Sequence, residues 1–454
     1  MAVKHPIQAI VENQKNGIPK GIYSACTASD YVIEAVLECA FKNKEYALIE
    51  ATANQVNQYG GYTGMKPKDY VKFVLGIARK VNFPEDKLIL GGDHLGPLTW
   101  VNENIDSAME KSRSLLREYI LAGFTKIHID TSMKVADDNK NTPLDTAVIA
   151  ERGAILCMVA EEAYKELLII NSNAVSPVYV VGSEVPIPGG SQESSQEEEE
   201  GLKVTRVEDF EATVDAFKNA YYRYNLQDAW DRVIAVVVQP GVEFGDESVH
   251  EYNREAAKDL VASLKKYQGI IFEGHSTDYQ TKYGLRKMVE DGIAILKVGP
   301  ALTFALREGL FALNHIENEY FKYNADIELS HFIDTLESSM VKNPSNWKKH
   351  YHGSSAAIKY ARKYSYSDRC RYYLPVEEVK VATQLLINNL ESVHIPLTLI
   401  HQFMPIQYNK IRAGILKNEP EALLKDWVVN CIDDYLYATL PTKSITPLVE
   451  SLVI

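Results

Sequence analysis

The sequence predicts a (β/α)8 barrel, a TIM barrel of the α/β class, followed by a C-terminal helical extension. Eight short apolar runs occur within the first 300 residues, segments of helical periodicity separate them, and from residue 323 helical patterns continue without matching strands. Eight strand–helix units of this size are typical of the barrel. A doubly wound sheet is the alternative, but its dinucleotide-binding form carries GxGxxG after the first strand, where this chain reads ACTASD.

The eight apolar runs are the predicted strands. Each is short, rich in Val, Ile and Leu, and ended by polar or small residues, as expected for parallel strands buried on both faces. In chain order they are 21–29, 46–52, 88–94, 126–132, 178–184, 233–240, 269–276 and 294–300. Helical patterns occupy 30–43, 67–81, 104–123 and 146–168, with helix starts predicted at Ser29-Asp30 and Asn104 and a stop at Gly123.

Two further segments complete the predicted organisation. The barrel is expected to cover 1–322, with a polar, acidic surface loop near 191–201 after the fifth strand. The extension is expected to cover 323–454 and to pack on the barrel or on a partner chain.

Composition excludes several classes of protein. The 48 Lys and Arg residues against 61 Asp and Glu residues leave a net charge of -13, which disfavours non-specific nucleic-acid binding. The five cysteines form no CxxC pair and predict reduced thiols rather than a disulfide framework. The N-terminus is amphipathic, and no apolar run is as long as the ~18 residues of a membrane span. We therefore expect a cytoplasmic protein without membrane or nucleic-acid partners.

Ionisable and amide side chains gather at the predicted strand ends. In a barrel, the carboxyl ends of the strands form the active site. Seven of the eight strands end in such residues or in glycine-rich sequence, which is hard to attribute to structure alone. The candidates at these ends are Asp93, His94, Asp130, Glu184, Gln239, Glu273, His275 and Asp278.

Two histidines and nearby carboxylates predict a site for a divalent metal ion. Glu273 and His275 point the same way because residues two apart in a strand share a face. His94, His275, Glu184 and Glu273 are the candidate ligands, and the donor set suits Zn, Ni, Mn or Co. Histidines satisfied within the core are the alternative. His128 faces the same way but is expected to lie deeper, as a core or supporting residue.

The ends of the last two strands predict a phosphate-binding site. The sequences GHST and VGPALT offer backbone N–H groups and hydroxyls, with a helix N-terminus behind them. Ordinary helix capping is the alternative. The candidate residues are Ser276, Thr277, Gly299 and Thr303.

Long motifs along nearly the whole chain resemble one family. They include LIEATANQVNQYGGYTGM, LGGDHLGP, KIHIDTSM, GSEVPIPGG, VVVQPGVEFG, HSTDYQTK, ILKVGPALTFALRE and, in the extension, YSYSDRCRYYLP. Together they resemble the GatZ/KbaZ family, known as the non-catalytic Z subunit of class II D-tagatose-1,6-bisphosphate aldolase.

The resemblance extends to catalytic class II aldolases, with departures. Their Asp-His pair after the third strand matches Asp93 as acid/base and His94 as metal ligand. Where they carry two further ligand histidines, this chain has Gln239 and Glu273, with His275 two residues on. Ordinary bisphosphate aldolase activity is thereby put in doubt. Some members of the family resemble epimerases that invert C4 of tagatose or fructose, free or as 6-phosphates.

The resemblance therefore implies a metal-dependent ketohexose or ketohexose 6-phosphate 4-epimerase that works by retro-aldol cleavage and re-addition. Asp93 would be the acid/base, and His94, His275 and Glu273 or Glu184 would hold the ion. Hydroxyls or ligands would be oriented by Asp130, Gln239 and Asp278. Two alternatives remain: a stabilising partner of a catalytic aldolase subunit, with the extension as interface, and a self-sufficient class II aldolase. We also expect a homo-oligomer.

Overall fold

The predicted TIM barrel is confirmed by the computed structural model, which describes residues 4–183 and 202–441. Glu184 and the predicted acidic loop near 191–201 lie outside the described residues. Parallel strands close the barrel in the order β1-β10-β9-β6-β5-β4-β3-β2. They are β1 (Ile22–Cys26), β2 (Ala47–Thr52), β3 (Leu88–Leu95), β4 (Lys126–Ile129), β5 (Val178–Val181), β6 (Val233–Val238), β9 (Ile271–Gly274) and β10 (Ile293–Val298). A separate hairpin, β7 (Glu243–Phe244) and β8 (Val249–His250), follows β6.

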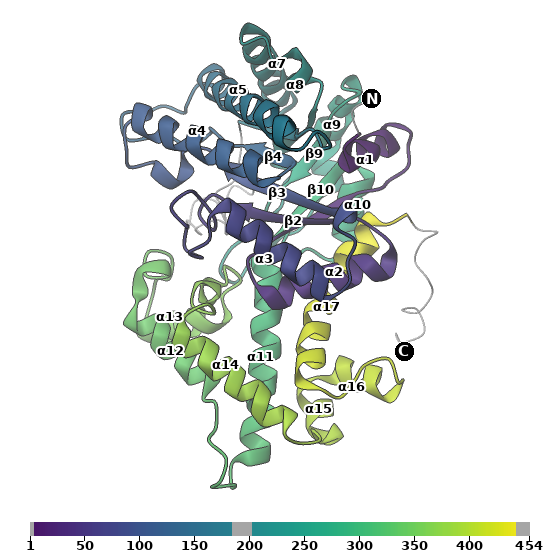
Figure 1. Ribbon diagram of the computed structural model, residues 1–454, viewed down its shortest axis with the longest axis vertical. Helices are drawn as coiled ribbons and strands as arrows, with labels where there is room; N and C mark the ends of the chain where they lie inside the picture. The colour runs from purple at the N-terminus through teal and green to yellow at the C-terminus, as the bar shows by residue number, and fades with distance from the viewer. Residues whose placement is uncertain (1–3, 184–201, 442–454) are drawn as a thin grey trace.

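Helices between consecutive strands form the outer layer of the barrel (Figure 1). They are α2 (Asp30–Asn43), α3 (Pro67–Lys80), α4 (Ile105–Ala122), α5 (Thr146–Ile170), α7 (Val207–Arg223), the short α8 (Gln227–Trp230), α9 (Arg254–Ser263) and α10 (Lys282–Glu290). At α4, the predicted helix start and stop are explained by capping. The Asn104 side chain accepts a hydrogen bond from the N–H of Ser107, and Gly123 ends α4 at a φ of 101°.

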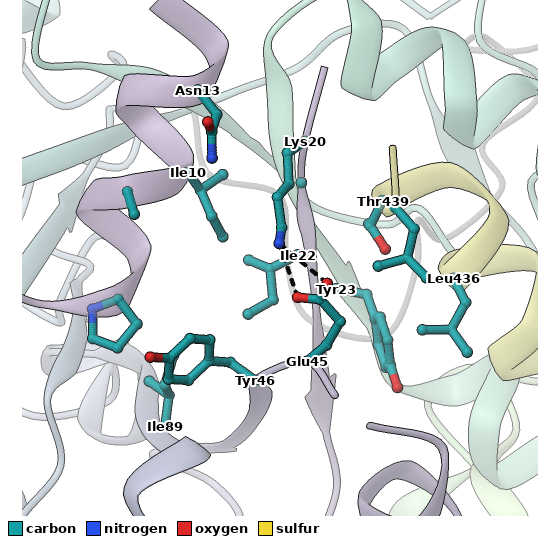
Figure 2. A pocket seen from close by; sticks show the side chains of 14 residues that line it. Ile10, Asn13, Lys20, Ile22, Tyr23, Glu45, Tyr46, Ile89, Leu436 and Thr439 are labelled. Carbon is teal, nitrogen blue, oxygen red and sulfur yellow. Dashed lines mark hydrogen bonds and ion pairs between the residues drawn. The ribbon is translucent and has the colours of Figure 1, made fainter. Parts of the chain in front are cut away.

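The N-terminal end of the barrel is closed by α1 (Pro6–Lys15). Ile7, Ile10 and Val11 pack with inward-facing apolar side chains of the strands, such as Leu48 and Ile89. Figure 2 shows a small pocket beside this helix, where an ion pair of 2.9 Å joins Lys20 Nζ and Glu45 Oε2. This pocket lies among strand beginnings, the end of a barrel that contributes stability rather than catalysis.

Two long helices connect the extension to the barrel (Figure 1). α11 (Pro300–Phe321) leaves the barrel after β10, and α17 (Pro420–Thr439) returns beside it. Between them lie α12 (Phe332–Lys342), α13 (Ser355–Tyr364), the 3-10 helix η5 (Arg369–Tyr372), α14 (Glu377–Glu391), α15 (Leu397–Phe403) and α16 (Pro405–Arg412).

The returning helix α17 completes the outer layer of the barrel. It contacts α10 on one side and α2 on the other, so it fills the gap between the last and first barrel helices. Its approach to α11 is close: a Cβ on Gly309 would lie 2.8 Å from Leu424 Cδ1. None of the helices in the described part of the chain is long and apolar enough to span a membrane.

Candidate metal centre

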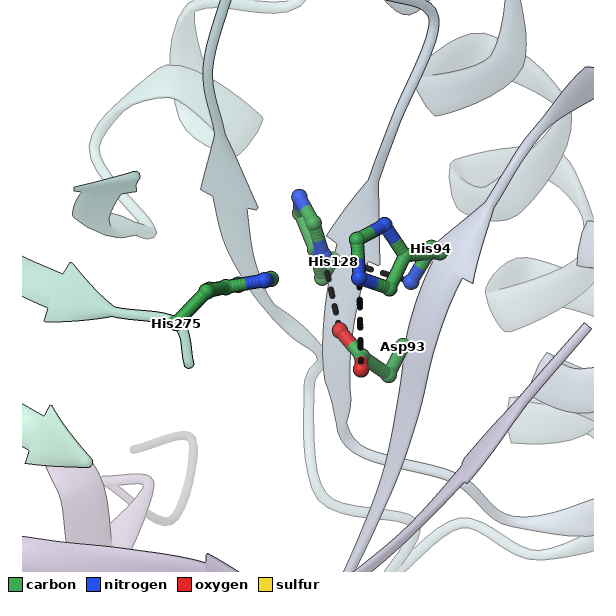
Figure 3. Close-up of side chains that lie close together, drawn as sticks. All are labelled: Asp93, His94, His128 and His275. Atoms are coloured by element: carbon green, nitrogen blue, oxygen red, sulfur yellow. Dashed lines mark hydrogen bonds and ion pairs between the residues drawn. The ribbon is translucent and has the colours of Figure 1, made fainter. Parts of the chain in front are cut away.

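Three histidines and one aspartate meet at the carboxyl end of the barrel. Asp93 and His94 come from β3, His128 from β4, and His275 directly follows β9. One ligand atom from each lies within 4.8 Å of those of the other three, and all four residues are buried. Figure 3 shows His275 pointing across the barrel toward the other three. The structure therefore brings together Asp93, His94 and His275, which were predicted from the strand ends, and adds His128 to them.

An irregularity in β3 lets two consecutive residues share this cluster. Neighbouring residues of a regular strand point to opposite faces. The pairing of β3 with β4 shifts register between Gly92 and Leu95, and His94 takes a left-handed φ of 49°. Such a conformation is uncommon for a residue other than glycine. It turns the His94 ring toward the side on which the Asp93 carboxylate already lies.

A carboxylate orients each of the three imidazoles. His94 Nδ1 lies 2.8 Å from Asp130 Oδ2, and His128 Nδ1 lies 2.9 Å from Asp93 Oδ1. His275 Nε2 lies 3.0 Å from Glu273 Oε1. Such pairing orients the ring and directs its other nitrogen, as is usual for metal-ligating histidines. The backbone N–H of His94 also lies 3.2 Å from His128 Nδ1.

One buried nitrogen of the cluster lacks a hydrogen-bond partner. His128 Nε2 is fully enclosed and has no hydrogen-bond partner among the described residues, while Nδ1 of the same ring faces Asp93. A buried polar atom without a partner costs free energy, and native proteins rarely leave one without a function. Three imidazoles with a carboxylate form a donor set suited to borderline divalent ions such as Zn²⁺, Ni²⁺ or Co²⁺. The residues present therefore fit a metal ion.

Toward the N-terminal ends of the strands, a buried ionic layer supports the cluster. Lys126 Nζ lies 2.8 Å from Glu50 Oε1 and 2.6 Å from Glu273 Oε2. Lys297 pairs with Glu50, and its Nζ lies 3.0 Å from Asp93 Oδ1. All five side chains are buried. Since removal of one partner would leave a buried charge uncompensated, these pairs constrain the carboxylates that touch the histidines.

Burial and the neighbouring charges set the protonation states. Burial opposes ionisation of Asp93, but the charges of His94 and Lys297 and the contact with His128 hold its pKa well below the usual value. Burial lowers the pKa of His275 to about 4, whereas Asp93 and Asp130 outweigh burial and raise the pKa of His94. At neutral pH Asp93 is therefore a carboxylate and His275 a neutral imidazole, the forms that bind a cation.

The remaining predicted catalytic and metal residues have other partners. Asp130 contacts His94, and Glu273 pairs with Lys126 and His275 rather than joining the four-residue cluster. Gln239 Oε1 accepts hydrogen bonds from the backbone N–H groups of Gly241 and Val242 and so stabilises a turn.

The predicted phosphate-binding donors are largely engaged within the protein. Thr277 Oγ1 donates to the carbonyl of Lys297, and Thr303 Oγ1 donates to Asp368 Oδ2 at 2.5 Å. Asp278 accepts hydrogen bonds from the N–H groups of Gly299 and Ala301, at the start of α11. Burial raises the pKa of Asp278 to about 6, although these hydrogen bonds act to lower it. Ser276 is only partly buried, at a left-handed φ of 51°.

Three members of the ionic layer, Glu50, Lys126 and Lys297, were given no role from the sequence, and His128 was expected to be a core or supporting residue. The sequence does carry a signal for the ionic layer. A lysine stands within the apolar strands TKIHID and ILKVG, and a glutamate stands within LIEAT. Lys126 and Lys297 sit amid Val, Ile and Leu, where a charge requires a partner. His128 also lies two residues after Lys126 in β4, so the same strand face leads to the cluster.

Comparison with known proteins gives both a family and a close structural relative. A family model described as "D-tagatose-1,6-bisphosphate aldolase subunit GatZ/KbaZ-like" matches residues 7–440. The crystal structure of a probable tagatose 6 phosphate kinase from Sinorhizobium meliloti 1021 has 42% sequence identity and a TM-score of 0.83, covering 93% of this chain and 100% of that chain. More distant matches are the YdjI aldolase from Escherichia coli K12 (10% identity, TM-score 0.40, 83% and 96% coverage) and a fructose-bisphosphate aldolase from Campylobacter jejuni (15%, 0.39, 85% and 92%).

Proposed function

This chain belongs to the D-tagatose-1,6-bisphosphate aldolase subunit GatZ/KbaZ-like family, and we propose that it is a metal-dependent 4-epimerase of ketohexoses or ketohexose 6-phosphates. It would interconvert tagatose and fructose forms. The observation that carries the proposal is the buried meeting of Asp93, His94, His128 and His275 at the catalytic end of the barrel. A subunit that only stabilises another enzyme has no need of that arrangement.

The chemistry of the substrate favours a retro-aldol route. The hydrogen on C4 of a 2-ketohexose is not adjacent to the carbonyl, so its direct removal as a proton is unfavourable. Instead, the C4 hydroxyl loses its proton, C4 becomes an aldehyde carbon, and the C3–C4 electron pair passes toward C2. Rotation of the aldehyde and re-formation of the C3–C4 bond on its other face invert C4. Atoms and electrons balance without an oxidant or co-substrate.

We assign the ion to His94, His128 and His275, with Asp93 beside them. His128 takes the place first given to Glu273, because the Glu273 carboxylate is engaged by Lys126 and His275. A divalent cation there would polarise the C2 carbonyl as a Lewis acid. The three imidazoles would hold it in place, and Asp130 keeps the His94 ring oriented.

Asp93 is the proposed acid/base for the C4 hydroxyl. Its low pKa keeps it in the form that accepts a proton. Lys297 and His128 contact its Oδ1 atom at 3.0 and 2.9 Å. Oδ2 has only longer contacts, 3.8 Å to Cys26 Sγ and 3.7 Å to His94 Nε2, and is the oxygen we assign to the reacting hydroxyl.

A single assay tests this activity. The purified chain is incubated with fructose, tagatose and their 6-phosphates, with added Zn²⁺, Ni²⁺, Mn²⁺ or Co²⁺ and, in parallel, after treatment with EDTA. We expect interconversion that EDTA abolishes and one of the ions restores, without accumulation of three-carbon products. Triose release would instead identify an aldolase, and lack of turnover with every sugar would contradict the proposal.

Replacement of His128 tests the ligand set. His128→Ala is expected to lower bound metal from near one equivalent to below 0.1 and activity by at least about 100-fold, since a lost ligand weakens both binding and catalysis. Metal is measured by mass spectrometry after dialysis. His394→Ala, an exposed histidine of the extension, is the matched control and should retain both properties. Full metal content in His128→Ala would contradict the assignment.

The family description favours a second candidate, a stabilising partner of a catalytic aldolase subunit. The helical extension would then supply the contact surface. Co-purification with such a subunit, together with a higher thermal stability of that subunit in the mixture, would support this role. One protein can have both roles, so the result of the binding assay does not decide the result of the turnover assay.

A further inference from the structure

A segment of the extension lies over the mouth of the barrel. This mouth segment, residues 365–372, is held by loops at the carboxyl ends of several strands. Ser365 Oγ donates to Asp246 Oδ1 at 2.6 Å, and Tyr279 Oη donates to the carbonyl of Tyr366 at 2.6 Å. The rings of Tyr62 and Tyr372 meet with centroids 4.8 Å apart. These contacts reach loops that follow β2, β6 and β9, so the segment borders the proposed active site.

The mouth segment carries two arginines that form no ion pair with a carboxylate of the described residues. Arg369 Nη2 contacts His350 Nδ1 at 3.1 Å, and Arg369 Nε is buried without a hydrogen-bond partner. Arg371 is held by the carbonyl of Asp368 and by Tyr372 Oη. Among residues 4–183 and 202–441, neither guanidinium forms an ion pair with a carboxylate.

The nearest carboxylate of the segment already has partners. Asp368 accepts hydrogen bonds from Thr303 and Cys370, and one of its oxygens lies 3.8 Å from Nε of the buried Arg307. Asp368 thus serves Arg307, although its charge also acts on Arg371. In the described part of the chain, Asp246 and Asp368 act on Arg369 and Arg371 only from beyond ion-pair distance.

The surroundings make the charge of Arg369 unfavourable in the free protein, whereas Tyr372, Tyr62 and Asp368 outweigh burial and raise the pKa of Arg371. Burial and the charge of Arg371 lower the pKa of Arg369. Burial and Arg369 also lower the pKa of His350 to about 4, so this ring is a neutral acceptor for Arg369. Removing cations from water without a counter-ion costs free energy. A dianion that bridged both guanidiniums would recover that cost, and the guanidinium fork matches phosphate oxygens.

We propose that Arg369 and Arg371 form a binding site for the phosphate group of a sugar phosphate. The inference rests on the proposed function and makes the phosphorylated sugar, rather than the free one, its substrate. It moves the phosphate from the donors at Thr277 and Thr303, which already have partners, to the mouth segment. The Arg371 guanidinium lies 4.5 Å from the ring centroid of Tyr372, and that ring contacts Tyr62 in the loop after β2, so Arg371 lies near the strand ends.

Binding measurements test the site independently of catalysis. Calorimetry is performed on the full chain with fructose 6-phosphate, fructose and inorganic phosphate. We expect fructose 6-phosphate to bind most tightly and Arg369→Gln to weaken it about 10- to 100-fold, the effect of a lost charge-assisted hydrogen bond. Binding of fructose should be unchanged. Arg412→Gln, an exposed arginine of the extension, is the matched control and should behave as wild type.

A measurement on the unmodified protein covers the case in which Arg369→Gln does not fold. Phenylglyoxal labelling, read by mass spectrometry, should modify Arg369 or Arg371 in the free chain, and fructose 6-phosphate should protect them while fructose does not. Lack of protection, or binding of inorganic phosphate without binding of fructose 6-phosphate, would overturn the site. Loss of turnover with retained Arg369-dependent binding would refute the epimerase and leave the phosphate site standing.

Discussion

At the scale of single residues, the site depends on backbone and side-chain placements that violate simple strand rules. Asp93 and His94 share one cluster only because His94 adopts a left-handed φ of 49°. Strained conformations of this kind persist where the surrounding structure enforces them, and they concentrate at functional sites. Here the contact of 2.8 Å with Asp130 and the register shift beside Gly92 hold the ring in place.

Gly91 leaves room for the ionic layer. A Cβ at this position would lie 2.6 Å from Glu50 Cγ, whose carboxylate is fixed by Lys126 and Lys297. We expect Gly91→Ala to lower the free energy of unfolding by about 1–3 kcal/mol, as overpacking does. Urea denaturation measures this. Gly76→Ala is the control, because nothing lies within 4 Å of its Cβ and alanine favours the α3 helix by about 0.5–1 kcal/mol. Equal effects at both positions would contradict this account.

Lys126 neutralises two carboxylates inside the barrel. Burial lowers its pKa, but Glu273 and Glu50 outweigh burial and raise it, so the lysine stays charged. Lys126→Met should destabilise the fold by about 3–5 kcal/mol, because it leaves buried carboxylates without a partner. The double variant Lys126→Met with Glu273→Gln should be more stable than the single variant in urea denaturation. A double variant that is less stable would show that Lys126 acts through packing alone.

At the scale of elements, α1 illustrates how a short helix can close a barrel. His5 caps it: Nδ1 accepts a hydrogen bond from the N–H of Ile7, and Nε2 contacts Thr125 Oγ1. The ring is 1% exposed, and burial lowers its pKa to about 4. The folded protein therefore resists protonation of His5, whereas the unfolded chain takes up the proton near pH 6.5.

This capping histidine predicts a specific acid sensitivity. Between pH 6.5 and 4 the unfolded chain binds more protons at His5 than the folded chain, so stability falls as the pH falls through this window. His5→Asn retains a cap but does not titrate. We expect the stability of wild type to fall more steeply than that of the variant, by about 1 kcal/mol per pH unit. Urea denaturation at pH 7, 6 and 5 checks this, and parallel pH profiles would contradict it.

At the scale of the whole molecule, barrel and extension share a core. α17 closes the outer layer between α10 and α2, and Tyr435 Oη donates to the carbonyl of Thr277 at the strand ends. Lys425 also pairs with Glu34 of α2 at 2.7 Å. Removing the extension would therefore expose apolar surface of the barrel itself.

The shared core predicts cooperative unfolding. We expect a single transition in urea, with the same midpoint when followed by circular dichroism and by fluorescence of the tryptophans. Trp347 and Trp427 of the extension and Trp100 and Trp230 of the barrel report on both parts. Gly309→Val, which separates α11 from α17, should lower that one midpoint. Two separate transitions would show that barrel and extension fold independently.

The sequence was more informative about the fold than about the site. All eight predicted runs are strands, with ends shifted by a few residues, because parallel strands buried on both faces must be apolar. Asp93, His94 and His275 were identified because polar groups at strand ends stand out. Lys126 and Lys297 were not assigned a role, since a lysine within a strand has a meaning only when its partners are known. Glu273 was predicted to be a metal ligand because its pairing with Lys126 and His275 is visible only in the folded chain.

Periodicity and composition, which are local properties of the chain, determined the strands, the helices and the end of the barrel that carries chemistry. Tertiary structure alone decided which charges neutralise one another, how His94 turns toward Asp93, and that α17 and the mouth segment return to the barrel. These outcomes depend on contacts between residues as far apart as Thr277 and Tyr435. The distances and electrostatic interactions that define them arise only when the chain is folded, and they are not encoded in any local pattern of residues.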